Sequence, residues 1–172
     1  MAVGAVVVVG SLLAMTPSQA APPAPSSANG ASSVTWGVPA HSGQGRRIVY
    51  KQTEPQHVWL VRKSGKVARD FPVSGRTDWP NPGHYAVFSK SPRSWNSTFG
   101  VKFRYMVRFT MGNSAAIGFH TIPRSLRTGE RVHSPDDLGR ALGRGGCPHV
   151  KVSNAEFLYA WAHMGTPVIV IR

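Results

Sequence analysis

The feature that most constrains the fold is a long alternation of side chains over residues 101–111. Successive residues of a β-strand point to opposite faces, so a period of two indicates a strand with one face in the core. One face would carry Val101, Phe103, Tyr105, Val107 and Phe109. The other would carry Lys102, Arg104, Met106, Arg108 and Thr110. We therefore predict a strand here that packs on one side against other elements.

Shorter runs of β-branched and aromatic residues occur on both sides of this stretch. They cover residues 47–52, 56–62, 67–73, 84–90 and 115–119, the last ending at His120. Turn-forming residues separate them, which is typical of sandwiches and curved sheets. The pattern therefore predicts a mainly β fold, either a sandwich or curved sheets, together with two short helices.

The two helices are expected after His120. Residues 134–137 (Ser-Pro-Asp-Asp) combine a cap, a first-position proline and an acidic residue, and Gly143 would end this helix. Residues 153–156 form a second capping box, with Gly165 as the C-terminal cap and a last strand after it. The second helix would place four residues in the core: Phe157, Leu158, Trp161 and Met164.

The first 20 residues are expected to be a secretion signal. The apolar run Val3–Met15 is shorter than the roughly 20 residues that a membrane-spanning helix needs. Small residues at Ser18 and Ala20 fit a cleavage site, although no Lys or Arg precedes the run. Residues 21–45, rich in Pro, Ala, Ser and Gly, are expected to be a flexible tether. The prediction is a secreted or cell-wall protein whose single domain spans residues 46–172.

The charge indicates an anionic environment. Lys and Arg number 20 against 7 Asp and Glu, a net charge of +13, all beyond residue 45. Nucleic acid is the usual partner of a basic domain. An exported protein rarely meets nucleic acid, so anionic wall polymers or a membrane surface fit better. A solvated basic face without a dedicated ligand is an equal alternative.

The single cysteine, Cys147, follows Gly145 and Gly146. Exported proteins normally pair their cysteines, so an odd one indicates an intermolecular bridge, a reactive thiol or a buried inert residue. Flanking glycines provide accessible backbone N–H groups, which favours a nucleophile in a loop. No His, Cys or carboxylate cluster has metal-ligand spacing, so neither a metal nor a cofactor is expected.

A thiol nucleophile needs a base, and His120 and His149 are the candidates. His120 ends an apolar strand, where a side chain can project into a site. His149 lies two residues from the thiol, and spacing alone favours His120 only modestly. The other histidines are expected in the tether, in loops or at the surface: His41, His57, His84, His133 and His163.

Residues 46–172 resemble the L,D-transpeptidase catalytic domain (YkuD) family, in its actinobacterial secreted form. The resemblance rests on the order of Gly-Phe-His at 118–120, Gly-Cys at 146–147, a Ser-Asn helix start and the strand Gly-Thr-Pro-Val. Upstream, Pro-Val-Ser-Gly at 72–75 and Pro-Gly at 82–83 also fit.

The resemblance implies a mainly β fold, a β-sandwich of mixed sheets with two short helices and the catalytic cysteine in a loop. It also implies a cysteine acyltransferase of peptidoglycan biosynthesis, which affects cell shape and is a β-lactam target. Cys147 would attack a tetrapeptide stem after diaminopimelate, release D-alanine and form a thioester. A neighbouring amine would complete a 3→3 cross-link, and water would give carboxypeptidase activity. His120 would be the base, oriented by the carbonyl of Thr121. Expected partners are therefore peptidoglycan stem peptides and carbapenems.

Other roles implied by the resemblance surround the thiol. Backbone N–H groups of Gly145, Gly146 and Cys147 would form the oxyanion hole, and the substrate-binding residues would be His149, Arg144 and Phe119. The chain departs from the family at Arg144 and Gly145, where Ser or Thr and often His occur. It departs again at Pro148, which replaces Val, Ile or Leu, and at His149, which replaces Arg or Asn.

Two alternatives to this enzyme remain open. The first is a catalytically degenerate wall-binding protein of the same fold, favoured by the changes around Cys147. The second is a nucleic-acid-binding domain, which only the charge suggests.

Overall fold

The computed structural model describes residues 1–5, 37–142 and 145–172. Most of the predicted signal and most of the predicted tether lie outside the described residues, as does Arg144. The domain belongs to a compact unit that spans Thr35–Arg172. Among the described residues, no helix combines the length and apolar character needed to cross a membrane.

The first sheet has five strands in the order β3-β2-β1-β10-β4. These are β1 (Arg47–Lys51), β2 (His57–Val61), β3 (Val67–Pro72), β4 (Gly83–Ala86) and β10 (Pro167–Ile171). β1 and β10 are parallel, with Val49 opposite Ile169, and the other neighbours are antiparallel. The C-terminal strand therefore lies inside the sheet, between the first strand and β4.

The second sheet has the order β5-β6-β7-β9, with β8 also paired to β6. Its strands are β5 (Ser89–Asn96), β6 (Val101–Met111), β7 (Ala116–Thr121), β8 (Arg124–Ser125) and β9 (His149–Val150). β7 and β9 are parallel, with His120 opposite His149. This pairing places the segment after Cys147 beside the end of β7.

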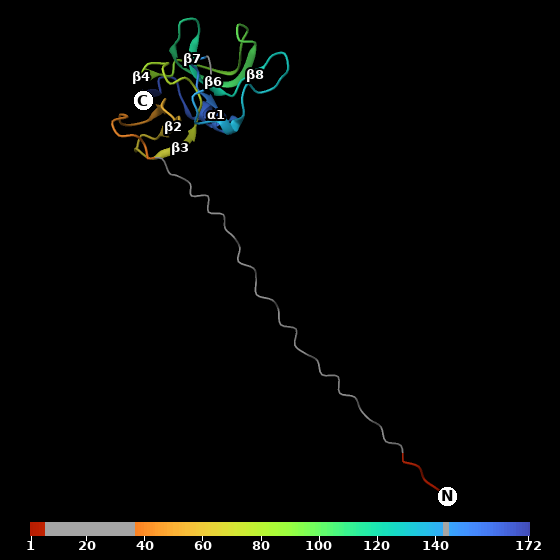
Figure 1. Ribbon diagram of the computed structural model, residues 1–172. Helices are drawn as coiled ribbons and strands as arrows, with labels where there is room; N and C mark the ends of the chain where they lie inside the picture. Colours follow the sequence, from red (N-terminus) through yellow and green to blue (C-terminus); the bar gives the residue numbers. More distant parts are fainter. Residues whose placement is uncertain (6–36, 143–144) are drawn as a thin grey trace. The chain divides into compact units, whose positions relative to one another are not determined.

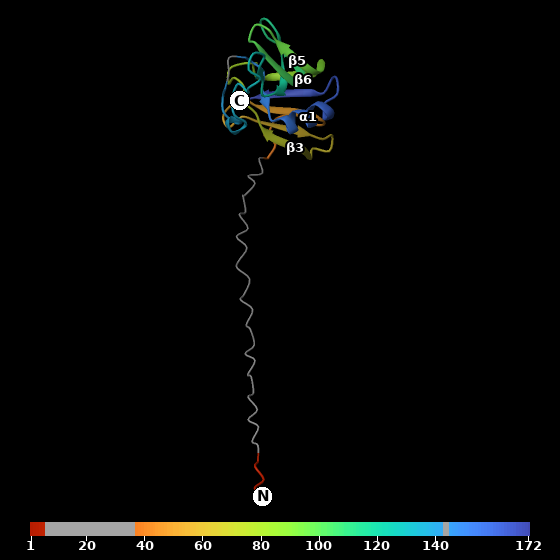
Figure 2. The same cartoon turned by 90° about the vertical axis from the view of Figure 1, so that its right-hand side faces the viewer.

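The core lies between the two sheets and the helix α1 (Val152–Trp161). Figures 1 and 2 show strands of the second sheet on one side of α1 and β3 of the first sheet on the other. Ile48 and Tyr50 from β1, Val107 from β6, Phe119 from β7 and Leu158 from α1 are completely buried within it. The expected mainly β fold with two mixed sheets is confirmed.

The alternation pattern predicted one strand at a place where the structure has two. The run predicted over residues 84–90 is divided between β4 of the first sheet and β5 of the second, with buried Val87 between them. The chain crosses from one sheet to the other there. The Val87 N–H bonds to the Thr166 carbonyl, while that of Phe88 bonds to Arg108.

The expected helices are shorter than predicted. Ser134 caps a 3-10 helix in a capping box with Asp137, but this helix covers only Pro135–Asp137, because Leu138 is already extended. A helix as far as Gly143 was therefore wrong.

α1 starts at Val152, and its cap position, Lys151, makes no side-chain capping bond. The predicted cap at Ser153 was wrong because β9 leads almost directly into the helix. α1 ends before Ala162, so Met164, expected in the core, lies beyond it and is exposed.

The ordered domain extends upstream of Arg46, the first residue predicted for it. Ser42, within the predicted tether, is buried. The Arg47 guanidinium donates to the carbonyl of Ser42 at 2.7 Å and to that of Gly45 at 2.9 Å. These bonds attach residues 42–45 to β1.

Candidate active site

Cys147 lies in the loop that precedes β9 and is half-buried. Its Sγ donates to the carbonyl of Ala116 at 3.8 Å. Burial raises the pKa of this thiol, opposed by a hydrogen bond with the backbone of Gly118 and by the charge of Arg108. The thiol is therefore protonated at neutral pH in this conformation.

His120, near the end of β7, is buried with 3% of its surface exposed. Its Nδ1 lies 2.8 Å from the carbonyl oxygen of Thr121, the hydrogen bond expected from the resemblance. A carbonyl can only accept, so Nδ1 carries the proton and Nε2 of the neutral ring has a free lone pair. The ring of Phe103 stacks on the imidazole, with centroids 3.9 Å apart. The imidazole is therefore fixed in position and in tautomer.

Burial lowers the pKa of His120 to about 4, so the ring is neutral at neutral pH. The thiol and the imidazole are thus both uncharged here, rather than a thiolate–imidazolium pair, because burial penalises each charged form. A neutral imidazole with a free Nε2 is suited to accept a proton during attack by a thiol.

Cys147 and His120 line one cavity of about 830 Å³. Gly146 and Trp79 also line it. Because Sγ contacts the Ala116 carbonyl, the Cys147 side chain must rotate to bring the thiol proton to Nε2 of His120. Catalytic hydrogen bonds are often long or poorly aligned in active sites without substrate.

Gly146 has a steric reason to be glycine. A Cβ there would lie 2.7 Å from Cδ1 of Trp79 and 2.8 Å from Cδ1 of Ile117. A Cβ at Gly145 would meet no atom within 4 Å. The residue next to the thiol therefore packs directly against the cavity wall, while Gly145 stays in open space.

His149 pairs with His133 from the loop before the 3-10 helix. Nδ1 of His133 donates to the carbonyl of Ser134 at 2.8 Å, and its Nε2 lies 3.0 Å from Nδ1 of His149. One of these two ring nitrogens must therefore donate the second bond and the other accept it. Burial and the neighbouring histidines lower the pKa of His149 well below its ordinary value.

The His133 and His149 rings stack 5.2 Å apart, and those of His149 and His120 are 5.1 Å apart. All three line the cavity that contains Cys147. Sequence analysis placed His133 in an ordinary loop. The pairing joins residues 16 positions apart, and no local pattern indicates it.

Arg108 is a second site residue that sequence analysis missed. Its guanidinium donates to the hydroxyls of Ser91 at 2.8 Å and of Ser89 and Ser94 at 3.2 Å each. Among the ion pairs formed by the described residues, none involves Arg108, so its charge is not neutralised by a carboxylate. It lines the cavity and lowers the pKa of both Cys147 and His120. The alternation predicted Arg108 on a strand but not which way that face points.

Phe119, expected to contact substrate, is a core residue. It is completely buried and stacks on Phe109 with centroids 5.0 Å apart. Neighbouring residues of β7 point to opposite sides, so His120 faces the cavity while Phe119 faces the core. His57, expected to be solvated, is also buried and its Nε2 lies 2.8 Å from the carboxylate of Asp70.

Comparison with known proteins gives one family. The family model described as the L,D-transpeptidase catalytic domain (YkuD) matches residues 45–170. No curated protein matches the chain in sequence.

Several solved structures share the fold. An L,D-transpeptidase (Yku) from Stackebrandtia nassauensis has 25% identity and a TM-score of 0.55, covering 75% of this chain and 56% of that one. An L,D-transpeptidase from Mycobacterium smegmatis has 21% identity and a TM-score of 0.53, covering 74% and 60%. The LD transpeptidase LdtMt1 in complex with imipenem has 22% identity and a TM-score of 0.53, covering 74% and 60%. The chain thus spans less than two thirds of these relatives.

Proposed function

The chain belongs to the family of L,D-transpeptidase catalytic domains, and from this premise we propose that it is a peptidoglycan L,D-transpeptidase working through a cysteine thioester. The observation that carries the proposal is the shared cavity, which is lined both by the Cys147 thiol and by the buried His120 imidazole, whose unprotonated Nε2 can accept a proton. The proposed location is the cell wall, after secretion and cleavage near Ala20.

The proposed reaction starts from the neutral pair. Nε2 of His120 takes the proton of Cys147 as Sγ attacks the carbonyl carbon of the L-centre of diaminopimelate, in its peptide bond to D-alanine in a tetrapeptide stem. The C–N bond to D-alanine breaks, and His120 returns the proton to the departing amine. A thioester remains on Cys147. Thr121 acts through its carbonyl, which keeps the Nδ1 proton in place and so directs Nε2 to the reaction.

Acyl transfer regenerates the thiol. The amine of a neighbouring stem attacks the thioester and gives its proton to His120, and the sulfur leaves and is reprotonated. This forms the 3→3 cross-link, while water in place of the amine gives L,D-carboxypeptidase activity. Backbone N–H groups of Gly145, Gly146 and Cys147 are the proposed donors to the oxyanion in both steps.

Substrate recognition is assigned to residues of the cavity wall. Arg108 offers a guanidinium without a carboxylate partner among the described residues, which suits a carboxylate of the stem. His149 offers a second imidazole near His120, with its Nδ1 engaged by His133. Arg144 remains a proposed contact that lies outside the described residues.

The test is mass spectrometry of the full chain with a diaminopimelate tetrapeptide stem. We expect the mass of the protein plus the tripeptide acyl group, release of D-alanine and a cross-linked dimer of stems. Cys147→Ser is the matched control and should give none of these, because one histidine does not ionise a hydroxyl. Serine activity near the wild-type rate would overturn the role of Cys147.

A carbapenem provides a second measurement. The relative LdtMt1 was solved in complex with imipenem, and we propose that imipenem acylates this chain once, at Cys147. Its lactam C–N bond would break as the thioester forms. A folded wild-type sample that gains no adduct and releases no D-alanine would instead support the wall-binding alternative.

A further inference from the structure

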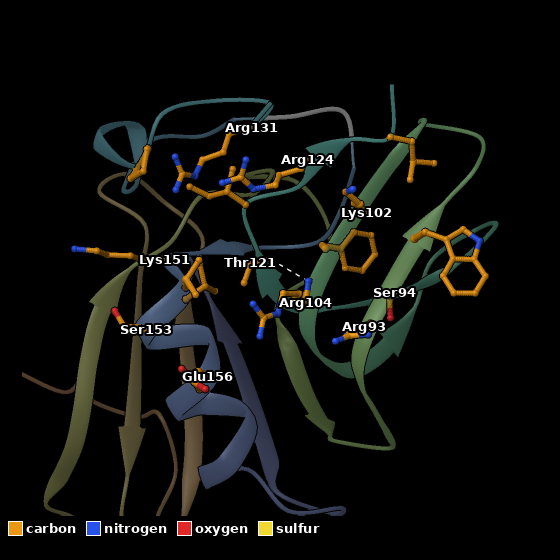
Figure 3. Close-up of a pocket in the computed structure, with 17 residues that line it drawn as sticks. Arg93, Ser94, Lys102, Arg104, Thr121, Arg124, Arg131, Lys151, Ser153 and Glu156 are labelled. Carbon is orange, nitrogen blue, oxygen red and sulfur yellow. Dashed lines mark hydrogen bonds between the residues drawn. The ribbon is translucent and has the colours of Figure 1, made fainter. Parts of the chain in front are cut away.

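A second cavity of about 900 Å³ lies beside the first and is markedly basic. Figure 3 shows the side chains that gather there from β5, β6, β8, α1 and neighbouring loops. Six of its lining residues are basic: Arg93, Lys102, Arg104, Arg124, Arg131 and Lys151. Among the described residues, Glu156 is the one acidic residue in this lining.

Strand pairing places these positive charges directly opposite one another. Lys102 of β6 is opposite Arg124 of β8, and Arg124 is in turn bridged to Arg131. Arg93 of β5 is opposite Arg104 of β6. Like charges in opposite positions of antiparallel strands repel, so the fold keeps an unfavourable arrangement here.

Within the described part of the chain, the ion pairs involve none of the six basic residues. Glu156 reaches one of them indirectly: its Oε1 accepts from the hydroxyl of Tyr105 at 2.9 Å, and that hydroxyl accepts from Arg104 at 2.8 Å. The other five charges are therefore left for a ligand outside the chain to neutralise.

We propose that this cavity binds a linear polymer with a phosphodiester in each short repeat. Opposite residues of paired strands lie about 5 Å apart, and Lys102 and Arg104 are about 7 Å apart along β6. A small monoanion would neutralise only two of these charges, whereas a polymer with closely spaced anionic groups can contact all six basic residues, here called the basic row. Arginine, the majority of the row, presents paired N–H donors that match phosphate oxygens.

The aromatic residues favour a polyol phosphate over single-stranded nucleic acid. Nucleic-acid grooves stack successive bases on several aromatic rings. Here Trp95, 72% exposed, is one free ring at the edge of the cavity. The other lining ring, Phe103, is stacked on His120. One open ring suits contact with a single repeat of the polymer.

The basic cavity adjoins the cavity of Cys147, because Ser94, Trp95 and Phe103 line both. A polymer held by the basic row would anchor the thiol site next to the wall material. Binding needs no turnover, so this proposal can fail or succeed independently of the proposed transpeptidase activity.

The test is calorimetric titration of the full chain with a poly(glycerol phosphate) chain at several salt concentrations. Lys102→Gln with Arg131→Gln removes two charges from the row. The matched control, Lys63→Gln with Lys66→Gln, removes two exposed charges from the turn between β2 and β3. We expect the first pair to weaken binding at least tenfold and to lower the salt slope by about 1.4, at about 0.7 for each phosphate contact. The control should change affinity less than twofold.

A second readout guards against misfolding. Loss of Lys102 and Arg131 relieves like-charge repulsion, so the double variant should melt at or above the wild-type temperature. Equal weakening by both pairs would overturn the proposal in favour of nonspecific attraction. Tighter binding of a single-stranded oligonucleotide would overturn it in favour of nucleic acid, and equal binding of polyglutamate would refute the preference for phosphodiesters.

Discussion

The rings of His120 and His149 lie 5.1 Å apart in the same cavity, but their hydrogen-bond partners differ, and so do their proposed roles. His120→Ala removes the proposed base, so kcat should fall by about 10²–10⁴-fold. His149→Ala removes a wall residue that His133 orients, so KM should rise while kcat changes little. Steady-state kinetics with a tetrapeptide stem measures both. The opposite pattern would exchange the two roles.

Arg108 acts on the thiol through charge. In Arg108→Gln the pKa of Cys147 should rise further, because a positive charge that favours the thiolate is removed. The pH dependence of iodoacetamide labelling measures this shift. Arg108→Lys, which keeps the charge, is the matched control and should shift the labelling curve less. Equal curves for both variants would show that the charge does not reach the thiol.

At the scale of elements, the approach of β7 to β6 determines where His120 stands. Gly118 allows this approach, since a Cβ there would lie 2.2 Å from the carbonyl oxygen of Val107. Gly118→Ala should therefore lower the free energy of unfolding by about 3 kcal/mol, the upper part of the range for overpacking.

Urea unfolding checks this value, and Gly37→Ala is the control. A Cβ at Gly37 meets no atom within 4 Å, so that change should stay within about 0.5 kcal/mol. A Gly118→Ala protein as stable as the control would mean that the two strands can separate at little cost.

At the scale of the whole molecule, buried histidines make stability depend on pH. The pKa values of His120, His149 and His57 lie below the ordinary value because each is buried. The unfolded chain binds protons at these sites first, so stability is full above about pH 6.5 and falls as the pH decreases. For His120, with a folded pKa of about 4, the loss reaches about 3 kcal/mol by pH 4.

Urea unfolding at pH 7.5, 5 and 4 measures this loss. His120→Gln carries no titrating ring and should lose about 3 kcal/mol less than the wild type between pH 7.5 and 4. Comparing the two changes, rather than the absolute stabilities, cancels the cost of the substitution itself. Equal losses would show that the pKa of His120 is the same in the folded and the unfolded protein.

Much of the fold was predictable because strand formation follows a local pattern. The alternation at residues 101–111 predicted β6, and the run ending at His120 predicted β7. The order of short motifs around Cys147 carried the family resemblance and, with it, the bond between His120 and Thr121. These features depend on neighbours in sequence or on residues that a family shares in order.

Tertiary structure decided which residues meet. Nothing in the local pattern could divide residues 84–90 between two sheets, bring His133 to His149, or place three serine hydroxyls on Arg108. Within the basic row, Lys102, Arg124 and Arg131 likewise come side by side only through strand register. Periodicity predicts that a strand forms, but Phe103 and Arg108, which it assigns to opposite faces of β6, line the same cavity. Partner and register depend on how distant segments pack, and that packing brings the cavities and their charges together.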